Sequence, residues 1–214
     1  VKYLFTEGRA IATILLWIPN FMNLLLLYLL RSWLPALLTE AGLSISAGVT
    51  ATTFLSFGGI VGCLAEGPLM SGCGSYMTLL FEFGLSGLFM GALALITGSL
   101  SMVSVVAFAL GFLITGAQSG LNALAASFYP TSIRSTGVGW ALGVGRVGSI
   151  AGPLVAGMLL SIGWKPSQIL MAGGAAGILA WISILASRYV RIGASPYSHA
   201  IRADRNARKE EARA

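Results

Sequence analysis

Charged residues are scarce in this sequence of 214 residues. Asp, Glu, Lys and Arg together make up 9% of it, whereas soluble domains carry roughly 25%. Hydrophobic residues, in contrast, make up 56%. This composition excludes an ordinary soluble domain and predicts an integral membrane protein.

Histidine and cysteine are also rare. The two cysteines, Cys63 and Cys73, form no metal-ligand pattern with His199, which is the one histidine. No nucleophile elbow or other catalytic set can be assembled. We therefore expect a protein that is not an enzyme and that holds no cofactor or metal. The net charge of +6 does not indicate a nucleic-acid-binding face, because seven of the thirteen basic residues follow Ser187.

Six apolar segments are long enough to cross a hydrocarbon layer of about 30 Å. We expect an all-α membrane protein with six transmembrane helices in a domain spanning residues 10–187. Residues 1–9 resemble a linker, so the chain reads as a piece of a longer protein, and residues 188–214 form a basic tail. The six segments are residues 10–33, 47–66, 76–97, 101–126, 135–161 and 167–187.

An even number of spans places both termini on one side of the membrane. The connections at 34–46, 98–100 and 161–166 then share the opposite side and contain only Glu40 and Lys165 as charges. Because basic residues gather at the termini and at Arg134, the positive-inside rule predicts cytoplasmic termini. Aromatic residues near both ends suit interfacial belts: Trp33, Trp164, Tyr129 and Tyr189.

Glycine and proline indicate how the helices pack. Many of the 28 glycines have the small-xxx-small spacing that lets helices approach closely. Proline should interrupt or bound helical segments at Pro19 and Pro130, and should kink or break the fifth segment at Pro153. The glycine pairs are Gly87 and Gly91, Gly116 and Gly120, Gly139 and Gly143, Gly148 and Gly152, and Gly173 and Gly177.

Arg146 is the most informative residue, because it lies inside the fifth apolar segment. A helix starting near Ser135 would carry it about 16 Å along the axis, close to the middle of the membrane. A charge at that depth costs at least about 2.5–3.5 kcal/mol unless it faces a partner or a wet cavity. We expect Arg146 either to bind an anionic ligand, with room beside Gly139 and Gly143, or to form a structural ion pair.

Glu82, in the third segment, is the one deep candidate for that ion pair. It lies about 9 Å from the predicted cytoplasmic end of its helix, so its carboxylate could instead reach the surface. A third interpretation is that Glu82 is a proton-coupling acid.

Four amides occupy two helical faces. Asn20 and Asn23 share a face of the first segment, and Gln118 and Asn122 share a face of the fourth. They either form hydrogen bonds between helices or line a cavity with Arg146 and bind the polar substituents of a ligand. The sequence leaves both interpretations open.

A long run at residues 116–149 reads GAQSGLNALAASFYPTSIRSTGVGWALGVGRVGS. This run resembles the aromatic acid:proton symporters of the major facilitator superfamily. The segments Phe21-Met-Asn-Leu-Leu and Ser32-Trp-Leu-Pro35 are similar to that family too. The resemblance extends to Val190 and implies the C-terminal half of a twelve-helix carrier, helices seven to twelve, built as two inverted three-helix repeats.

The resemblance implies proton-driven import of an aromatic carboxylate such as 4-hydroxybenzoate, benzoate or protocatechuate across a bacterial inner membrane. Arg146 would be the carboxylate partner, and Arg134 a cytoplasmic gate or a lipid anchor. Trp140, with Trp17 and Phe21, would favour an aromatic ring. The implied partners are the substrate, protons, membrane lipid and an N-terminal six-helix half.

One loop departs from the family pattern Gly-x-Leu-Met-Asp-Arg-x-Gly. This chain reads Gly-Pro-Leu-Met-Ser-Gly-Cys-Gly at residues 67–74, so Ser71 and Gly72 replace the charged pair. Glu66 supplies a negative charge one residue upstream. This departure leaves an inactive truncated remnant as one alternative to the aromatic acid carrier. A carrier for another organic anion is a further alternative, and a membrane enzyme is the least favoured one.

Overall fold

The computed structural model describes Leu4 and residues 10–96 and 99–193. Six helices fill these residues, and each is long and apolar enough to span a membrane. This confirms the predicted all-α multi-pass fold. The helices are α1 (Ala10–Glu40), α2 (Ile45–Cys73), α3 (Ser75–Leu95), α4 (Leu100–Phe128), α5 (Arg134–Ser161) and α6 (Pro166–Gly193).

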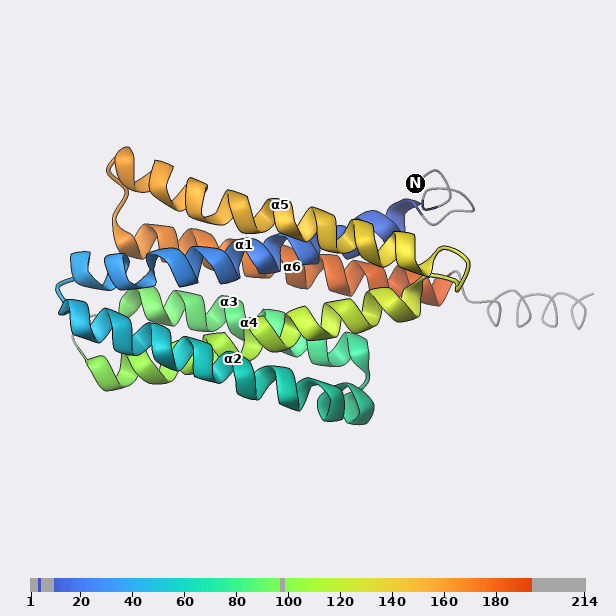
Figure 1. Cartoon of the computed structure of the whole chain (residues 1–214), viewed down its shortest axis with the longest axis horizontal. Helices are drawn as coiled ribbons and strands as arrows, with labels where there is room; N and C mark the ends of the chain where they lie inside the picture. The colour runs from blue at the N-terminus through green and yellow to red at the C-terminus, as the bar shows by residue number, and fades with distance from the viewer. Residues whose placement is uncertain (1–3, 5–9, 97–98, 194–214) are drawn as a thin grey trace, which may run out of the picture.

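The helices run up and down in one bundle (Figure 1). The α1–α2, α3–α4 and α5–α6 connections lie together at one end, and the first helix starts at the other end. This arrangement confirms the predicted grouping of the connections. Most of the predicted basic tail, including His199, lies outside the described residues.

The pattern of neighbours reveals two structural repeats. The most extensive packing joins α2 to α4, α1 to α5 and α3 to α6. If α1, α2 and α3 exchange places with α4, α5 and α6 in that order, the same three pairs of neighbouring helices result. Two equivalent three-helix repeats, as expected from the sequence, produce this pattern. The α1, α2, α4 and α5 helices form one layer, and α3 and α6 lie behind it (Figure 1).

Several expected boundaries were wrong because proline does not end these helices. Residues 34–40 were expected in a connection but continue α1 through Pro35. Pro19 and Pro153 also lie inside unbroken helices, as does Pro68, which was expected beyond the end of α2. Neighbouring helices stabilise such positions, so the loss of one backbone donor does not end the span.

Glycine allows the closest helix contacts, although two of the five predicted pairs do not behave as expected. A Cβ at Gly148 or Gly152 of α5 would collide with a backbone carbonyl of α1, at Phe21 or Leu25 respectively. In contrast, a Cβ built at Gly91, Gly139 or Gly143 meets no atom within 4 Å. The Gly139–Gly143 pair therefore faces open space instead of a neighbouring helix.

Tyr129, expected in an aromatic belt, is buried instead. Only 1% of its side chain is exposed, and a Cβ on Gly137 would collide with its ring. The ring fills the space that this glycine leaves at the start of α5. Trp33 also turns inward, because its Nε1 donates a hydrogen bond to the backbone carbonyl of Pro153 at 3.0 Å.

Candidate functional site

Arg146 lies in the middle of α5 and is exposed at the surface of the bundle. Among the described residues, none forms a hydrogen bond or ion pair with its guanidinium group. In particular, Glu82 does not pair with it, because both Glu82 carboxyl oxygens are buried without a hydrogen-bond partner. The described residues therefore supply no ion pair to Arg146, and its five N–H donors are available to a ligand.

The predicted amides form one hydrogen-bonded cluster between α1 and α4, which we call the amide cluster: Asn20, Asn23, Gln118 and Asn122. Asn23 Nδ2 donates to Gln118 Oε1 at 3.0 Å. Gln118 Nε2 in turn lies 3.3 Å from Oδ1 of Asn20 and 3.3 Å from Oδ1 of Asn122. Gln118 therefore connects all four residues.

The amide cluster has an accessible part and an inaccessible part. Asn20 and Asn23 are buried at 1% and 0% exposure, and Asn23 also donates to the Ile114 carbonyl at 2.9 Å. Gln118 is half-buried, and Asn122 is exposed. Asn23 thus forms the hydrogen bonds between helices that one interpretation expects. The ligand-binding interpretation stays a prediction, for which Gln118 and Asn122 are the accessible members.

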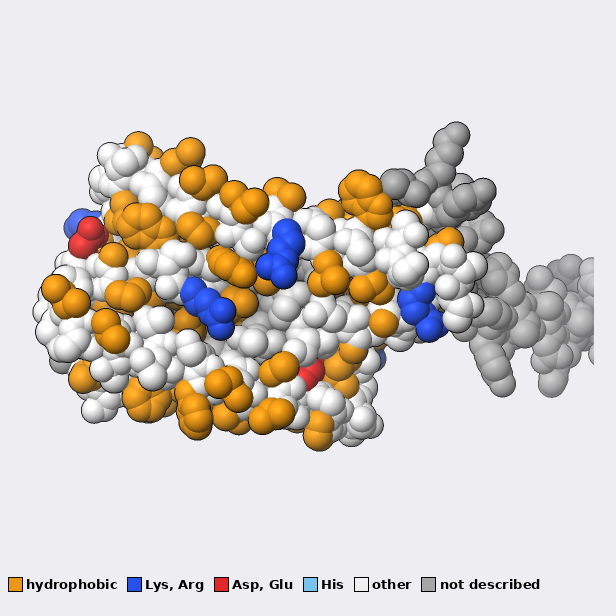
Figure 2. All heavy atoms as spheres, viewed as in Figure 1, with side chains coloured by type: hydrophobic (Ala, Val, Ile, Leu, Met, Phe, Trp, Pro, Cys, Tyr) orange, Lys and Arg blue, Asp and Glu red, His pale blue; other side chains and the backbone are white. Residues whose placement is uncertain are grey.

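Arg146 lies at about the same depth as this cluster. A Cβ built on Gly145, the residue before it, would lie 3.3 Å from the backbone oxygen of Asn20. Arg146 and the amide cluster are therefore at a similar depth, on adjacent helices. Figure 2 views this layer and shows basic side chains set apart on a surface of hydrophobic and uncharged atoms.

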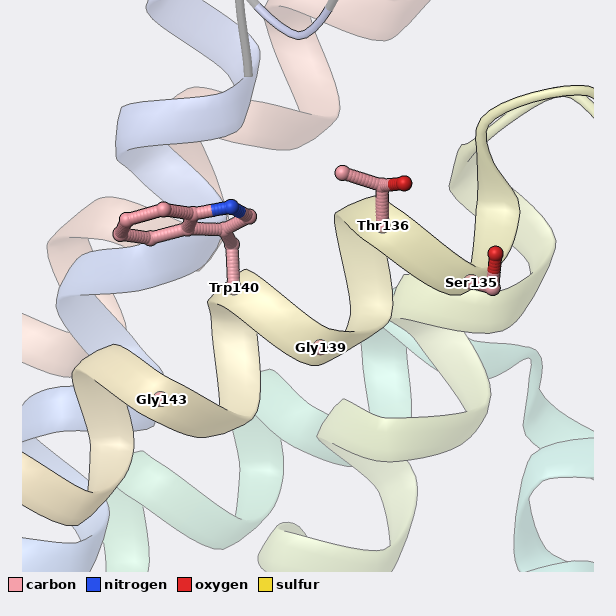
Figure 3. Close-up of a pocket in the computed structure, with 5 residues that line it drawn as sticks. All are labelled: Ser135, Thr136, Gly139, Trp140 and Gly143. Carbon is pink, nitrogen blue, oxygen red and sulfur yellow. The ribbon is translucent and has the colours of Figure 1, made fainter.

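An open groove of about 430 Å³ follows the part of α5 that precedes Arg146. Its lining residues lie along one side of the helix, and its floor is bare backbone at Gly139 and Gly143 (Figure 3). Positions 139, 143 and 146 share a helical face, so the groove leads toward the guanidinium group. The lining residues are Ser135, Thr136, Gly139, Trp140 and Gly143.

Trp140 stacks on Trp17 of α1. The ring centroids are 5.9 Å apart and the ring planes differ by 18°. Six residues separate Trp140 from Arg146, which places the two side chains about 120° apart around α5. The two predicted aromatic residues, Trp17 and Trp140, thus contact each other. Trp140 does not lie on the face of α5 that carries Arg146.

Arg134 is the first residue of α5, at the turn that follows Tyr129. Its Nε lies 3.4 Å from the Tyr129 backbone oxygen, and its side chain is exposed. This contact closes the α4–α5 turn and places a positive charge at its surface, far along α5 from Arg146.

Two charged residues of interest were missed in the site prediction. Arg31 is the one charge in the interior of α1; it is exposed and lies eleven residues after Asn20, so it shares the face of Asn20. Glu66 of α2 is 3% exposed, and its carboxyl oxygens have no hydrogen-bond partner. The signal for both was a lone charge inside an apolar segment.

The described residues contain no group of His, Cys, Asp or Glu side chains that could hold a metal ion. The two cysteines are both free and exposed. Cys63 Sγ instead contacts Ser119 Oγ at 3.0 Å across the α2–α4 packing.

Comparisons with known proteins find several relatives. The gallate transporter of Pseudomonas putida is 37% identical over 195 residues, which are 91% of this chain and 43% of that protein. The 3-(3-hydroxy-phenyl)propionate transporter of Escherichia coli is 40% identical over 196 residues, 90% of this chain and 48% of that protein. The benzoate transport protein of Acinetobacter baylyi is 40% identical over 166 residues, 76% of this chain and 34% of that protein.

The chain spans less than half the length of these relatives. No protein-family model matches it. The names of the relatives share one chemistry, the transport of an aromatic acid.

Proposed function

Because the chain belongs to the aromatic acid transporters of the major facilitator superfamily, we propose that it provides helices seven to twelve of a carrier that imports an aromatic carboxylate with protons. The observation that carries this proposal is the unpartnered guanidinium of Arg146 in the middle of a membrane-spanning helix. A second six-helix half would cover the layer formed by α1, α2, α4 and α5, and the substrate would bind between the halves.

In this proposal Arg146 binds the carboxylate through two parallel N–H bonds. Charge-assisted hydrogen bonds contribute about 1.5–3 kcal/mol each, so this contact offsets the cost of placing a guanidinium in the membrane. Gln118 and Asn122, the accessible amides, would bind a hydroxyl substituent on the ring. The Gly139–Gly143 groove gives the substrate access to the backbone of α5.

The remaining roles follow from charge and position. Glu82 is the proton-coupling candidate, because it is a buried acid and no described residue supplies a hydrogen-bond donor to its carboxyl group. Arg134, exposed at the α4–α5 turn, is the candidate for a gate at that end of the bundle. Arg31 adds a second positive charge along the proposed path of the anion.

Uptake of radiolabelled substrate tests the proposal in cells that express the complete carrier containing this chain. We expect accumulation of 4-hydroxybenzoate or benzoate that an uncoupler abolishes. Arg146→Ala and Arg146→Lys should both reduce uptake, by about 10- to 100-fold, because neither side chain makes a bidentate contact. Lys165→Ala, an exposed charge in the α5–α6 connection, is the matched control and should transport normally.

The second candidate is a carrier for a non-aromatic organic anion. It is favoured by one observation, that amides lie beside Arg146 whereas the Trp17–Trp140 stack is on another side of α5. Competition by cyclohexanecarboxylate against labelled benzoate separates the two candidates, because both compounds carry the same carboxylate. Equal competition would show that the ring is not recognised as aromatic, and would overturn the aromatic acid assignment.

We further propose that the protein is a non-enzymatic carrier of a bacterial inner membrane, with both ends of this chain in the cytoplasm. The excess of Lys and Arg at the ends of the chain supports this orientation. Labelling of single cysteines in intact cells tests it. A cysteine in the α1–α2 connection should react with a membrane-impermeant maleimide, and one in the α4–α5 turn should not; the reverse pattern would contradict the orientation.

A further inference from the structure

Glu66 and Glu82 lie at the same depth on adjacent antiparallel helices. Gly74, in the turn between α2 and α3, is midway between them in the sequence. Each carboxyl group is therefore about 12 Å from that turn along its helix. Antiparallel helices place residues equidistant from their connection side by side, and α4 packs against both helices at this point.

The two carboxyl groups meet at the glycines of α4. A Cβ built on Gly116 would lie 2.8 Å from Glu82 Oε1 and 3.5 Å from Glu66 Oε2, and one built on Gly120 would collide with Glu66 Oε1. Glu66 is 3% exposed and Glu82 1% exposed. All four carboxyl oxygens are buried and have no hydrogen-bond partner among the described residues.

Among the residues whose side chains the structure describes, none supplies a positive charge to this pair. Apart from Glu66 and Glu82, α2, α3 and α4 contain no Asp, Glu, Lys, Arg or His. The other titratable groups of these helices, Tyr76 and the thiols of Cys63 and Cys73, cannot carry a positive charge. Arg188 of α6 points to the Met77 sulfur, 3.1 Å away, and forms no ion pair with either acid.

Two ionised carboxylates cannot be stable side by side in such a place. Burial penalises each charge, the two charges repel, and neither group has a donor for the other. One proton removes one charge and supplies an O–H donor that the second carboxylate accepts. At the active site of aspartic proteases, two carboxyl groups likewise share one proton, because two carboxylates so close together cannot both be ionised.

We propose that Glu66 and Glu82 form a single proton-binding site, in which one proton is held between the two carboxyl groups at neutral pH. The site lies on the Gly116–Gly120 face of α4, and the amide cluster lies on the opposite face, because Gln118 is two residues from each glycine. A change in the proton occupancy therefore acts on the helix that carries Gln118. The use of this proton in transport rests on the proposed function, whereas its presence does not.

Infrared difference spectroscopy of the purified chain in lipid nanodiscs tests the site. The carbonyl stretch of a protonated carboxylic acid is distinct from that of a carboxylate, and it shifts in D₂O. We expect this band in the wild-type protein at neutral pH, with the intensity of one carboxyl group per molecule. It should be absent from the Glu66→Gln, Glu82→Gln double variant and unchanged in Glu40→Gln, which alters an exposed acid at the end of α1.

The single variants distinguish a shared proton from two independent ones. In Glu82→Gln, the new amide donates a hydrogen bond to the Glu66 carboxylate, which can then remain ionised. The net charge of this site equals that of the wild-type pair with one shared proton. We therefore expect either single variant to lose the whole band. Retention of the band in both would show that each acid holds its own proton, and a wild-type protein without the band would overturn the proposal outright.

Two further measurements keep the test decisive. If a single variant fails to fold, the intensity of the wild-type band, one carboxyl group or two, still decides between a shared proton and independent ones. Sodium titration of the wild-type protein is the other measurement, because loss of the band with rising Na⁺ would show that the pair prefers a cation. Uptake by the complete carrier is recorded separately. A carrier that shows the band but does not transport aromatic acids would refute the proposed function and would still support the proton-binding site.

Discussion

Asn23 Nδ2 donates a hydrogen bond to Gln118 Oε1 at 3.0 Å and so joins α1 to α4. These are the first helices of the two three-helix repeats, and they meet in the layer that carries Arg146. A buried polar contact therefore lies at the centre of the layer that we propose to face the substrate. Its strength sets how readily α1 and α4 separate.

A double-mutant cycle measures this contact. Asn23→Leu and Gln118→Leu should each lower the thermal stability of the chain in detergent, and the two effects should not add. We expect a coupling free energy of about 0.6–1.7 kcal/mol, the range for hydrogen bonds between membrane helices. Additive effects would show that the two amides do not interact in solution.

Two glycines of α5 should respond in opposite directions to the same substitution. Gly148→Ala should destabilise the bundle by about 1–3 kcal/mol, because the new methyl group would collide with the Phe21 carbonyl of α1. Gly143→Ala meets no atom within 4 Å and should leave stability unchanged or raise it by up to about 1 kcal/mol. Thermal unfolding followed by circular dichroism compares them; similar losses in both would contradict the close α1–α5 approach.

The stacked pair Trp17 and Trp140 should stabilise the α1–α5 packing. Trp140→Leu removes an aromatic pair that contributes about 0.5–1.5 kcal/mol beyond area burial, whereas Trp140→Phe keeps a ring and should lose less. Chemical unfolding of the two variants gives the difference. Equal stability of the Leu and Phe variants would show that stacking adds nothing.

Tyr129 should make the stability of the chain depend on pH in alkaline solution. Burial raises the pKa of the Tyr129 phenol above its ordinary value, an effect that the side chains of Thr13 and Trp17 partly oppose. Above pH of about 10 the unfolded chain loses this proton more readily than the folded one, so stability falls as pH rises. Tyr129→Phe should unfold with a shallower alkaline dependence than the wild type; parallel curves would contradict the prediction.

The sequence predicts the depth and the helical faces of the polar residues better than their contacts. The depth of Arg146 and the spacing of the four amides follow from helical geometry, and the amides do form one cluster. Whether Arg146 pairs with Glu82 could not be predicted, because that depends on which helices α5 contacts. Glu66 and Arg31 could have been found as lone charges in apolar segments. Which residues they approach, however, depends on the helices that pack against them, and the sequence does not give those.

The sequence by itself determined that this stretch of chain forms six membrane-spanning helices, because charge scarcity, span length and glycine spacing are local properties of the chain. It did not determine where α1 ends, since Pro35 breaks a helix in isolation but not one supported by its neighbours. Only the tertiary structure decided that Glu66 and Glu82 meet at Gly116 while Arg146 has no ion-pair partner in the described part of the chain. Those relationships depend on α4 packing against both α2 and α3, and such long-range packing leaves no periodic signal along the chain.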